Sequence, residues 1–117
     1  MITAKETKQR MLDDPRWWKI ALMDFVDDFR YHRNADAIAQ TFVLGDEEKD
    51  AVLAGTIETL CDEMDIPIPE WLGNVPPCHE PLFLSRVEAL KAFSIVESPV
   101  HFRLRKVFVH DNFLFRV

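Results

Sequence analysis

Large apolar side chains recur at helical spacing in the first half of the chain. Four of them fall at i, i+4, i+7 and i+11 and so share one helix face: Trp18, Leu22, Phe25 and Phe29. Asp14 and Pro15 precede this stripe and predict the helix start, with Asp14 as the N-cap and Pro15 at the first helical position. The helix is expected to run to about Tyr31 or Arg33.

A second apolar stripe follows Gly45 and predicts another long helix. Asp46 is its expected N-cap, and its apolar positions are Leu53, Ile57, Leu60 and Met64. The helix must end by Ile66, because Pro67 disfavours helical geometry in the residue before it. Gly55 lies in its middle, where glycine costs about 1 kcal/mol relative to alanine. A close approach of another helix at Gly55 would explain this residue.

The other segments predict shorter helices around a strap rich in proline. Residues 66–84 hold five of the seven prolines together with large apolar groups, which indicates a stiff segment packed across the protein rather than a linker. Short helices are expected over 35–43, over 85–96 after the Ser85–Glu88 capping box, and from Ser98-Pro99 to about residue 106.

These elements predict an all-α fold. We expect a single domain, residues 1–117, built as a small bundle of about four to six helices with the proline-rich strap. Residues 1–13 are polar with little periodicity and predict either a flexible arm or a short helix. The alternative is an α+β fold, in which residues 107–109 form one short C-terminal edge strand.

Charge is distributed unevenly along the chain. The net charge is −6, yet the segment from Ser98 onward holds four basic residues against one acidic residue, Asp111. The remainder holds ten basic and nineteen acidic residues. An acidic body disfavours nucleic-acid binding, which depends on phosphate contacts. The basic end could dock an acidic partner or pair with the protein's own body.

The sequence lacks the common patterns of catalytic and metal sites. Its four histidines do not have the spacing of zinc ligands, and Cys61 and Cys78 form no CxxC pair, so no metal or cofactor is expected. The run Cys78-His79-Glu80 gives an enzyme hypothesis without an orienting third group. With no secretory signal and no apolar run that could span a bilayer, we expect a cytoplasmic protein without membrane association.

Two groups of residues are candidates for binding a partner. The first group is cationic and C-terminal: Arg103, Arg105, Lys106 and Arg116. Phe102 and Phe108 beside them could stack on bases, but we favour the alternative that the arginines pair with carboxylates of the acidic body. The second candidate is Trp17, because adjacent residues of a helix point about 100° apart and Trp18 occupies the apolar face. An exposed Trp17 would suit a protein partner or a homodimer.

The C-terminal segment carries a recognisable pattern: Glu97-Ser98-Pro99, Phe102-Arg103, Arg105, Phe108-Val109, Asn112, Leu114 and Arg116. It resembles the signature ESPxxFRxRNIFVxxNxLxRA of a family of small uncharacterised bacterial proteins. Pro69-Glu70-Trp71 resembles the PEW element of that family and Glu80-Pro81-Leu82-Phe83 its EPWF element, so the resemblance covers roughly residues 47–117. Lys106 stands where the family usually has Asn.

Members of that family look like companions of nucleotidyltransferase-type genes in toxin–antitoxin-like arrangements. The resemblance implies a cytoplasmic accessory or antitoxin-like protein and supplies no catalytic residues. We therefore expect a non-enzymatic protein that binds a nucleotidyltransferase-like toxin, or a second copy of itself, through Trp17 or the basic C-terminal segment. A nucleic-acid-binding regulator that uses the basic segment is the alternative.

Overall fold

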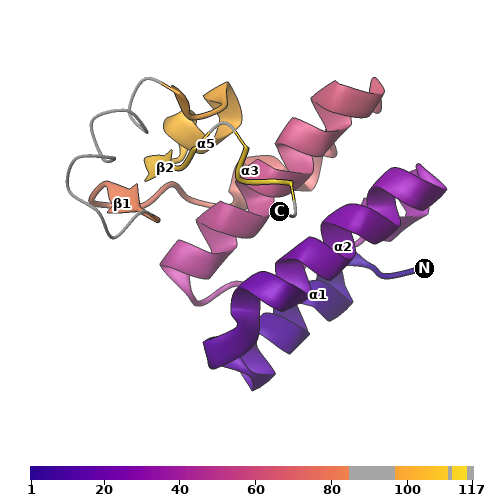
Figure 1. Cartoon of the computed structure of the whole chain (residues 1–117), viewed down its shortest axis with the longest axis horizontal. Helices are drawn as coiled ribbons and strands as arrows, with labels where there is room; N and C mark the ends of the chain where they lie inside the picture. Colours follow the sequence, from indigo (N-terminus) through magenta and orange to yellow (C-terminus); the bar gives the residue numbers. More distant parts are fainter. Residues whose placement is uncertain (85–96, 111, 116–117) are drawn as a thin grey trace.

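Helices dominate the computed structural model, which describes residues 1–84, 97–110 and 112–115 (Figure 1). The three long helices are α1 (Ala4–Asp13), α2 (Trp18–His32) and α3 (Glu47–Met64), and α5 (Val100–Leu104) is a short helix near the C-terminus. Single 3₁₀ turns lie at Pro15–Trp17 (η1), Ala35–Ile38 (η2) and Glu70–Asn74 (η3). The predicted all-α class is confirmed.

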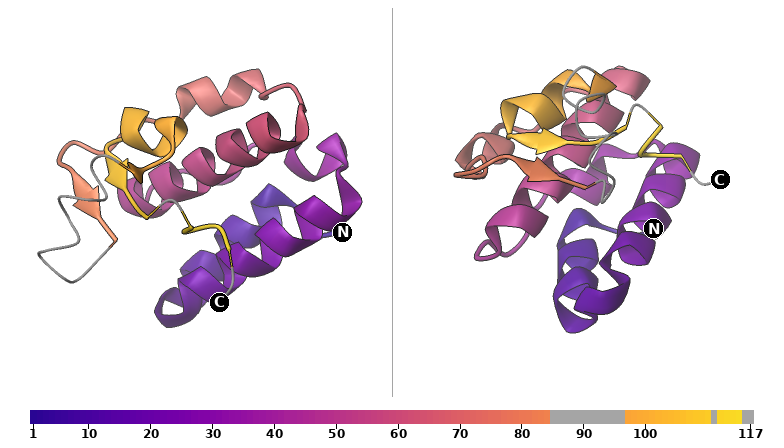
Figure 2. Two further views of the ribbon diagram at one scale, coloured as in Figure 1. Left: turned by 45° about the horizontal axis from the view of Figure 1, so that its top comes forward. Right: turned by 60° about the vertical axis from the view of Figure 1, so that its left-hand side comes forward.

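Helix α3 occupies the middle of the molecule. The α1–α2 pair packs along one side of it, and α5 lies on another side together with a small sheet (Figures 1 and 2). The sheet joins β1 (Leu82–Phe83) to β2 (Val107–Phe108) in parallel, with Leu82 opposite Val107. The stretch expected to be extended at 107–109 thus supplies a strand, as in the alternative fold, but two residues a strand leave the molecule predominantly helical.

The N-terminal residues form a docked helix. Thr3 caps α1 by accepting a hydrogen bond from a backbone N–H of the first turn at 3.1 Å. Lys8 is buried, where its ammonium group pairs with the Asp50 carboxylate of α3 and donates to the Val43 carbonyl at 2.6 Å. Of the two alternatives expected for residues 1–13, a flexible arm or a short helix, the structure shows the short helix, over residues 4–13.

Helix α3 begins and ends where the sequence places it. The Asp46 side chain accepts a hydrogen bond from the Lys49 backbone N–H at 3.1 Å, which satisfies one of the free donors of the first turn. At the other end, Asp65 takes the left-handed conformation, with φ at 56°. This residue stops the helix two positions before Pro67, as the proline requires.

The ends of α2 and the segment after it depart in part from expectation. The helix ends at His32, within the expected limits, but Asp14 makes no side-chain capping bond, and Pro15 opens η1 instead of α2. The short helix predicted over 35–43 is wrong beyond Ile38, where only the single turn η2 forms. The residues after this turn lead without regular structure to Gly45, whose φ is 140°.

Gly55 lies where α3 meets α5. A Cβ atom at this position would lie 2.9 Å from Cδ1 of Phe102, whose side chain is fully buried. The expected close approach of a second helix is confirmed, and the group that fills the space is an aromatic ring from α5.

Some predictions fall outside the described residues. These are the helix over 85–96, with its Ser85–Glu88 capping box, and the candidate residue Arg116. In the part of the chain that the structure does describe, no helix has both the length and the apolar character needed to cross a membrane.

Candidate interaction surfaces

Arg105, a predicted partner-binding residue, belongs to the interior. It is 8% exposed, and its guanidinium group donates to Oε1 of Glu58 at 2.6 Å, to the Val75 carbonyl at 2.7 Å and to the Leu72 carbonyl at 2.9 Å. One cation thus joins α3, the strap and the C-terminal segment, which is the structural role that we favoured for the arginines. Because each of its three nitrogens donates to a group of the protein itself and the side chain is almost fully buried, Arg105 has a structural role here.

The strap is a packed part of the molecule, as predicted. Leu72, Val75 and Cys78 are buried, and the Trp71 indole donates to the Ile38 carbonyl at 2.9 Å. Its later residues pair with the C-terminal segment through three backbone N–H···O bonds of 2.8–3.2 Å. The bonds run from Cys78 to Arg105, from Leu82 to Lys106 and from Leu84 to Phe108.

The helix expected from Ser98-Pro99 to about residue 106 forms as α5 only over Val100–Leu104, and Ser98 does not cap it. Pro99 takes the N-cap position, and the buried Ser98 hydroxyl turns to Val109 instead. The hydroxyl donates to the Val109 carbonyl at 2.9 Å and accepts from the Val109 backbone N–H at 2.8 Å. The serine therefore satisfies both main-chain groups of a residue that follows β2, as a neighbouring strand would.

Arg30 of α2 holds the end of the C-terminal segment. Two of its nitrogens donate to the two carboxylate oxygens of Glu63 on α3, each at 2.9 Å, and a third donates to the Leu114 carbonyl at 2.6 Å. The Phe115 ring lies over the same guanidinium group, 4.5 Å from its carbon. Hydrogen bonding from Arg30 holds the pKa of Glu63 below its usual value. The described C-terminal residues up to Phe115 are thus folded against α2.

The other described residues of the basic group remain at the surface. Arg103 is exposed and forms no ion pair with any residue of the described ranges. Lys106 is exposed too, with its ammonium group 3.4 Å from the His79 carbonyl. Its φ is 59°, a left-handed conformation in which Asn is enriched among residues other than glycine.

The most exposed tryptophan is Trp17, as predicted. It is 52% exposed, whereas Trp18 turns toward the core and is half-buried. Ile20, in the first turn of α2, is 49% exposed and lines the same hollow as Trp17. This hollow, of about 170 Å³, is completed by Arg10, Asp13, Asp14 and Ala21, and we call Trp17, Ile20 and the hollow the Trp17 face.

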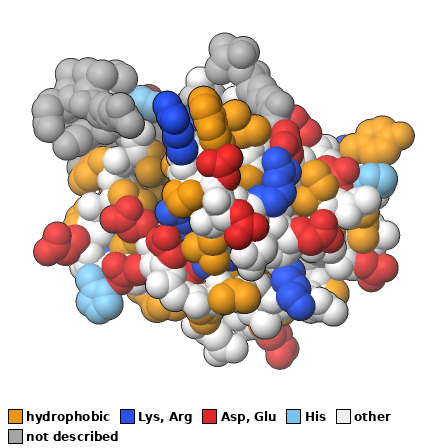
Figure 3. All heavy atoms as spheres, turned by 90° about the horizontal axis from the view of Figure 1, so that it is seen from below, with side chains coloured by type: hydrophobic (Ala, Val, Ile, Leu, Met, Phe, Trp, Pro, Cys, Tyr) orange, Lys and Arg blue, Asp and Glu red, His pale blue; other side chains and the backbone are white. Residues whose placement is uncertain are grey.

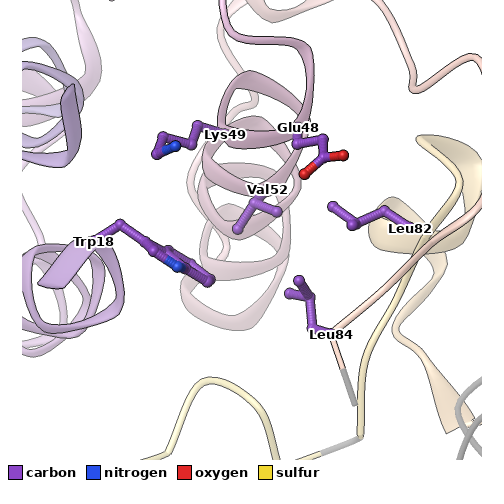
Figure 4. A pocket seen from close by; sticks show the side chains of 6 residues that line it. All are labelled: Trp18, Glu48, Lys49, Val52, Leu82 and Leu84. Carbon is purple, nitrogen blue, oxygen red and sulfur yellow. The ribbon is translucent and has the colours of Figure 1, made fainter. Parts of the chain in front are cut away.

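A second hollow lies nearer the centre of the molecule, between α2, α3 and β1. Figure 4 shows Trp18, Val52, Leu82 and Leu84 directed into it from three sides, with Glu48 and Lys49 above. Its volume is about 120 Å³ and its walls are mainly apolar. Glu48 and Lys49 are the titratable groups among its described lining residues, and no group of three metal-ligating residues occurs there. Over the face in Figure 3, acidic side chains alternate with apolar and basic ones.

The histidines lie against carboxylates, and both cysteines are free thiols that are buried. Each histidine lies against a carboxylate: His32 against Asp28, His79 against Glu47, His101 against Asp62, and His110 against Glu97. Burial raises the pKa of the Cys78 thiol, the opposite of what a thiolate nucleophile needs. The described ranges contain no group of three residues that could hold a metal ion.

No family model, curated protein or solved structure matches the chain. The structure brings the predicted residues to two separate places, with Trp17 at the α1–α2 corner and Arg103 and Lys106 at the α5–β2 end. Sequence reasoning missed Ile20 as an exposed group, although it falls off the apolar stripe of α2. It also missed the role of Arg30 in holding the C-terminal segment, because a single arginine on the polar face of a helix does not indicate its partner.

Proposed function

We propose that this chain is a non-enzymatic accessory protein that binds a partner protein through the Trp17 face, and that the partner is a nucleotidyltransferase-type toxin whose surface it masks. The observation that carries the proposal is the exposed Trp17–Ile20 pair beside its hollow. The class of partner comes from the resemblance of the C-terminal segment to small bacterial proteins that accompany such enzymes. In this role the protein would act as an antitoxin.

The Trp17 face has the chemistry of a binding hot spot. Tryptophan is enriched at such positions, because one rigid side chain covers a large apolar area and loses little conformational entropy on binding. Trp17 and Ile20 are each about half exposed, so covering them would contribute on the order of 1 kcal/mol apiece. A hollow next to them gives a partner side chain a place to insert. Together these features support a protein partner more than a small substrate.

A nucleic-acid-binding regulator is the second candidate, and the exposed Arg103 is the observation in its favour. It has less support, because Arg105 faces the interior and Arg30 ties down the tail. This candidate predicts an affinity for host DNA or RNA that falls steeply with salt concentration and with replacement of Arg103. A gel-shift assay at low salt tests it, and unshifted nucleic acid would eliminate it.

Isolation of the tagged protein from its native host tests the first proposal. We expect one partner at a stoichiometric ratio, identified by mass spectrometry, and we expect its nucleotidyl-transfer activity to fall when this chain is added. Trp17→Asp and Ile20→Asp should each abolish the complex. Tyr31→Asp is a matched control, because Tyr31 is an aromatic residue of α2 that is 82% exposed and lies about 20 Å further along the helix.

Two results would contradict the proposal. Recovery of the free wild-type chain alone would count against any stable partner. A complex that survives both Trp17→Asp and Ile20→Asp would show that a different surface binds. Circular dichroism of each variant checks that the helices are retained, so that loss of binding is not loss of folding. Size-exclusion chromatography of the isolated chain separates a homodimer from a monomer.

A further inference from the structure

Two carboxylates at the rim of the Trp17 face have no cationic partner. Asp13 accepts one hydrogen bond, from the neutral amide of Gln9 at 2.8 Å, and Asp14 makes no side-chain capping bond to η1. Neither forms an ion pair with a lysine, arginine or histidine within the described ranges. Both residues are exposed and line the hollow together with Trp17.

Arg10 and Arg16, the two arginines close to these carboxylates in the sequence, already have other contacts. Arg10, which also lines the hollow, donates to Asp24 of α2 at 3.1 Å. Arg16 places its guanidinium group 5.6 Å from the centre of the Trp17 ring. This contact shows that a cation can lie on the indole, and since Arg16 is at the surface, a partner's cation can take its place. Two anions thus remain at the rim beside an indole ring.

We propose that the Trp17 face recognises a basic segment of the partner, one arginine or lysine side chain of which enters the hollow between the Trp17 ring and the carboxylates of Asp13 and Asp14. This inference rests on the proposed function, and it adds the chemistry that the partner must present. The apolar wall of Ile20 and Ala21 would cover the aliphatic stem of that side chain, as the stems of long cationic side chains require.

The size and charge of the protein agree with this occupant. An apolar cavity of about 150 Å³ accommodates benzene, so the hollow of about 170 Å³ has room for the end of one long side chain. The net charge of −6 attracts a basic surface and accelerates its encounter with this chain. Recognition should therefore weaken as salt concentration rises, since exposed charges are screened.

Binding of two small peptides tests the chemistry directly. The probes are the capped tripeptides Ac-Leu-Arg-Leu-NH₂ and Ac-Leu-Cit-Leu-NH₂, in which citrulline keeps the shape of arginine without its charge. Backbone and indole signals of the ¹⁵N-labelled full chain are followed by NMR during each titration. We expect saturable shifts at Trp17, Asp13 and Asp14 with the arginine peptide, and affinity lower by about two- to fivefold with citrulline.

Variants of the full chain separate the outcomes. Asp13→Asn with Asp14→Asn should remove the preference for arginine over citrulline, whereas Asp36→Asn, an exposed carboxylate on η2, should leave it unchanged. Equal shifts with both peptides, or none at Trp17 with either, would overturn the inference. The natural complex adds a further distinction. If the complex persists in the variant with both Asp13→Lys and Asp14→Lys but is lost with Trp17→Asp, the proposed function is supported and the inference of a basic partner segment is refuted.

Discussion

Replacing Gly55 with alanine should destabilise the protein, although alanine favours helices more than glycine does. Two effects oppose each other at this position. The helix propensity of alanine stabilises α3 by about 1 kcal/mol. The new methyl group, however, would lie 2.9 Å from Cδ1 and 3.2 Å from Cε1 of Phe102, closer than carbon atoms pack.

The buried ring of Phe102 has little freedom to move away. It is fully buried, and it packs edge-on against Phe113 with the ring centres 5.7 Å apart. Overpacking of a well-filled core costs roughly 1–3 kcal/mol. The clash therefore outweighs the gain in helix propensity, and we expect Gly55→Ala to lower the free energy of unfolding by roughly 1 kcal/mol.

Urea unfolding followed by circular dichroism measures this change. Gly73→Ala is the control, because no atom beyond its own residue and its two chain neighbours lies within 4 Å of a Cβ at Gly73. It should alter the free energy of unfolding by less than about 1 kcal/mol. In a Phe102→Ala background the clash is absent, so alanine at position 55 should stabilise by about 1 kcal/mol, which gives a coupling energy of about 2 kcal/mol. A more stable Gly55→Ala single variant would refute the reasoning.

Four further predictions follow from the described contacts. Lys106→Asn should raise the free energy of unfolding by up to about 1 kcal/mol, because asparagine tolerates the left-handed φ of 59° better than lysine does. The urea midpoint should rise with it, and an unchanged or lower midpoint would contradict this. Arg105→Lys should lower the free energy of unfolding by roughly 2–4 kcal/mol, because one ammonium group cannot reach three acceptors in a fork; calorimetry showing an unchanged Tm would argue against it. Lys8→Met leaves the Asp50 carboxylate buried without its cation and should cost roughly 3–5 kcal/mol, with partial rescue by Asp50→Asn; no change in urea unfolding would mean that α1 is not docked. Burial raises the pKa of the Cys61 thiol to about 11, above its ordinary value of roughly 8.5, so the stability that burial of the neutral thiol supplies is lost as pH rises between these values. Labelling of Cys61 at neutral pH should need urea, and equal labelling rates with and without urea would contradict its burial.

Elements with a strong apolar period could be predicted from the sequence. The limits of α3 followed from Asp46 and Pro67, because a cap and a proline act through local geometry. Helix α1 was harder to predict, since two of its four inward positions, Thr7 and Lys8, are polar. Lys8 becomes a core residue only because Asp50, far away in sequence, supplies the countercharge. A binary pattern of apolar and polar residues cannot show such a pair.

The candidate binding residues also differ in whether local geometry or the tertiary fold determines their surroundings. Trp17 is exposed as expected, but it closes η1 while Trp18 begins α2, so the 100° step between adjacent α-helix residues does not by itself account for its exposure. The role of Arg105 depends on Glu58 of α3 and on two strap carbonyls, and only the tertiary fold brings these groups together. From the sequence, Arg105 could either pair with the protein's own carboxylates or bind a partner. In the structure it pairs with Glu58 of the protein itself. The unpaired carboxylates of Asp13 and Asp14 likewise become visible only when every neighbouring cation is located.

The burial of Phe102, Val107 and Leu114 has a consequence for synthesis of the protein. A ribosome delivers the chain from its N-terminus, so these side chains arrive after the helices they cover. Until then the Gly55 side of α3 is exposed to solvent, and the two strap carbonyls that accept from Arg105 lack this donor. The nascent polypeptide therefore exposes this apolar flank until residues 102–114 have been synthesised, and a stop codon before them would leave it permanently in the state that chaperones and proteases recognise.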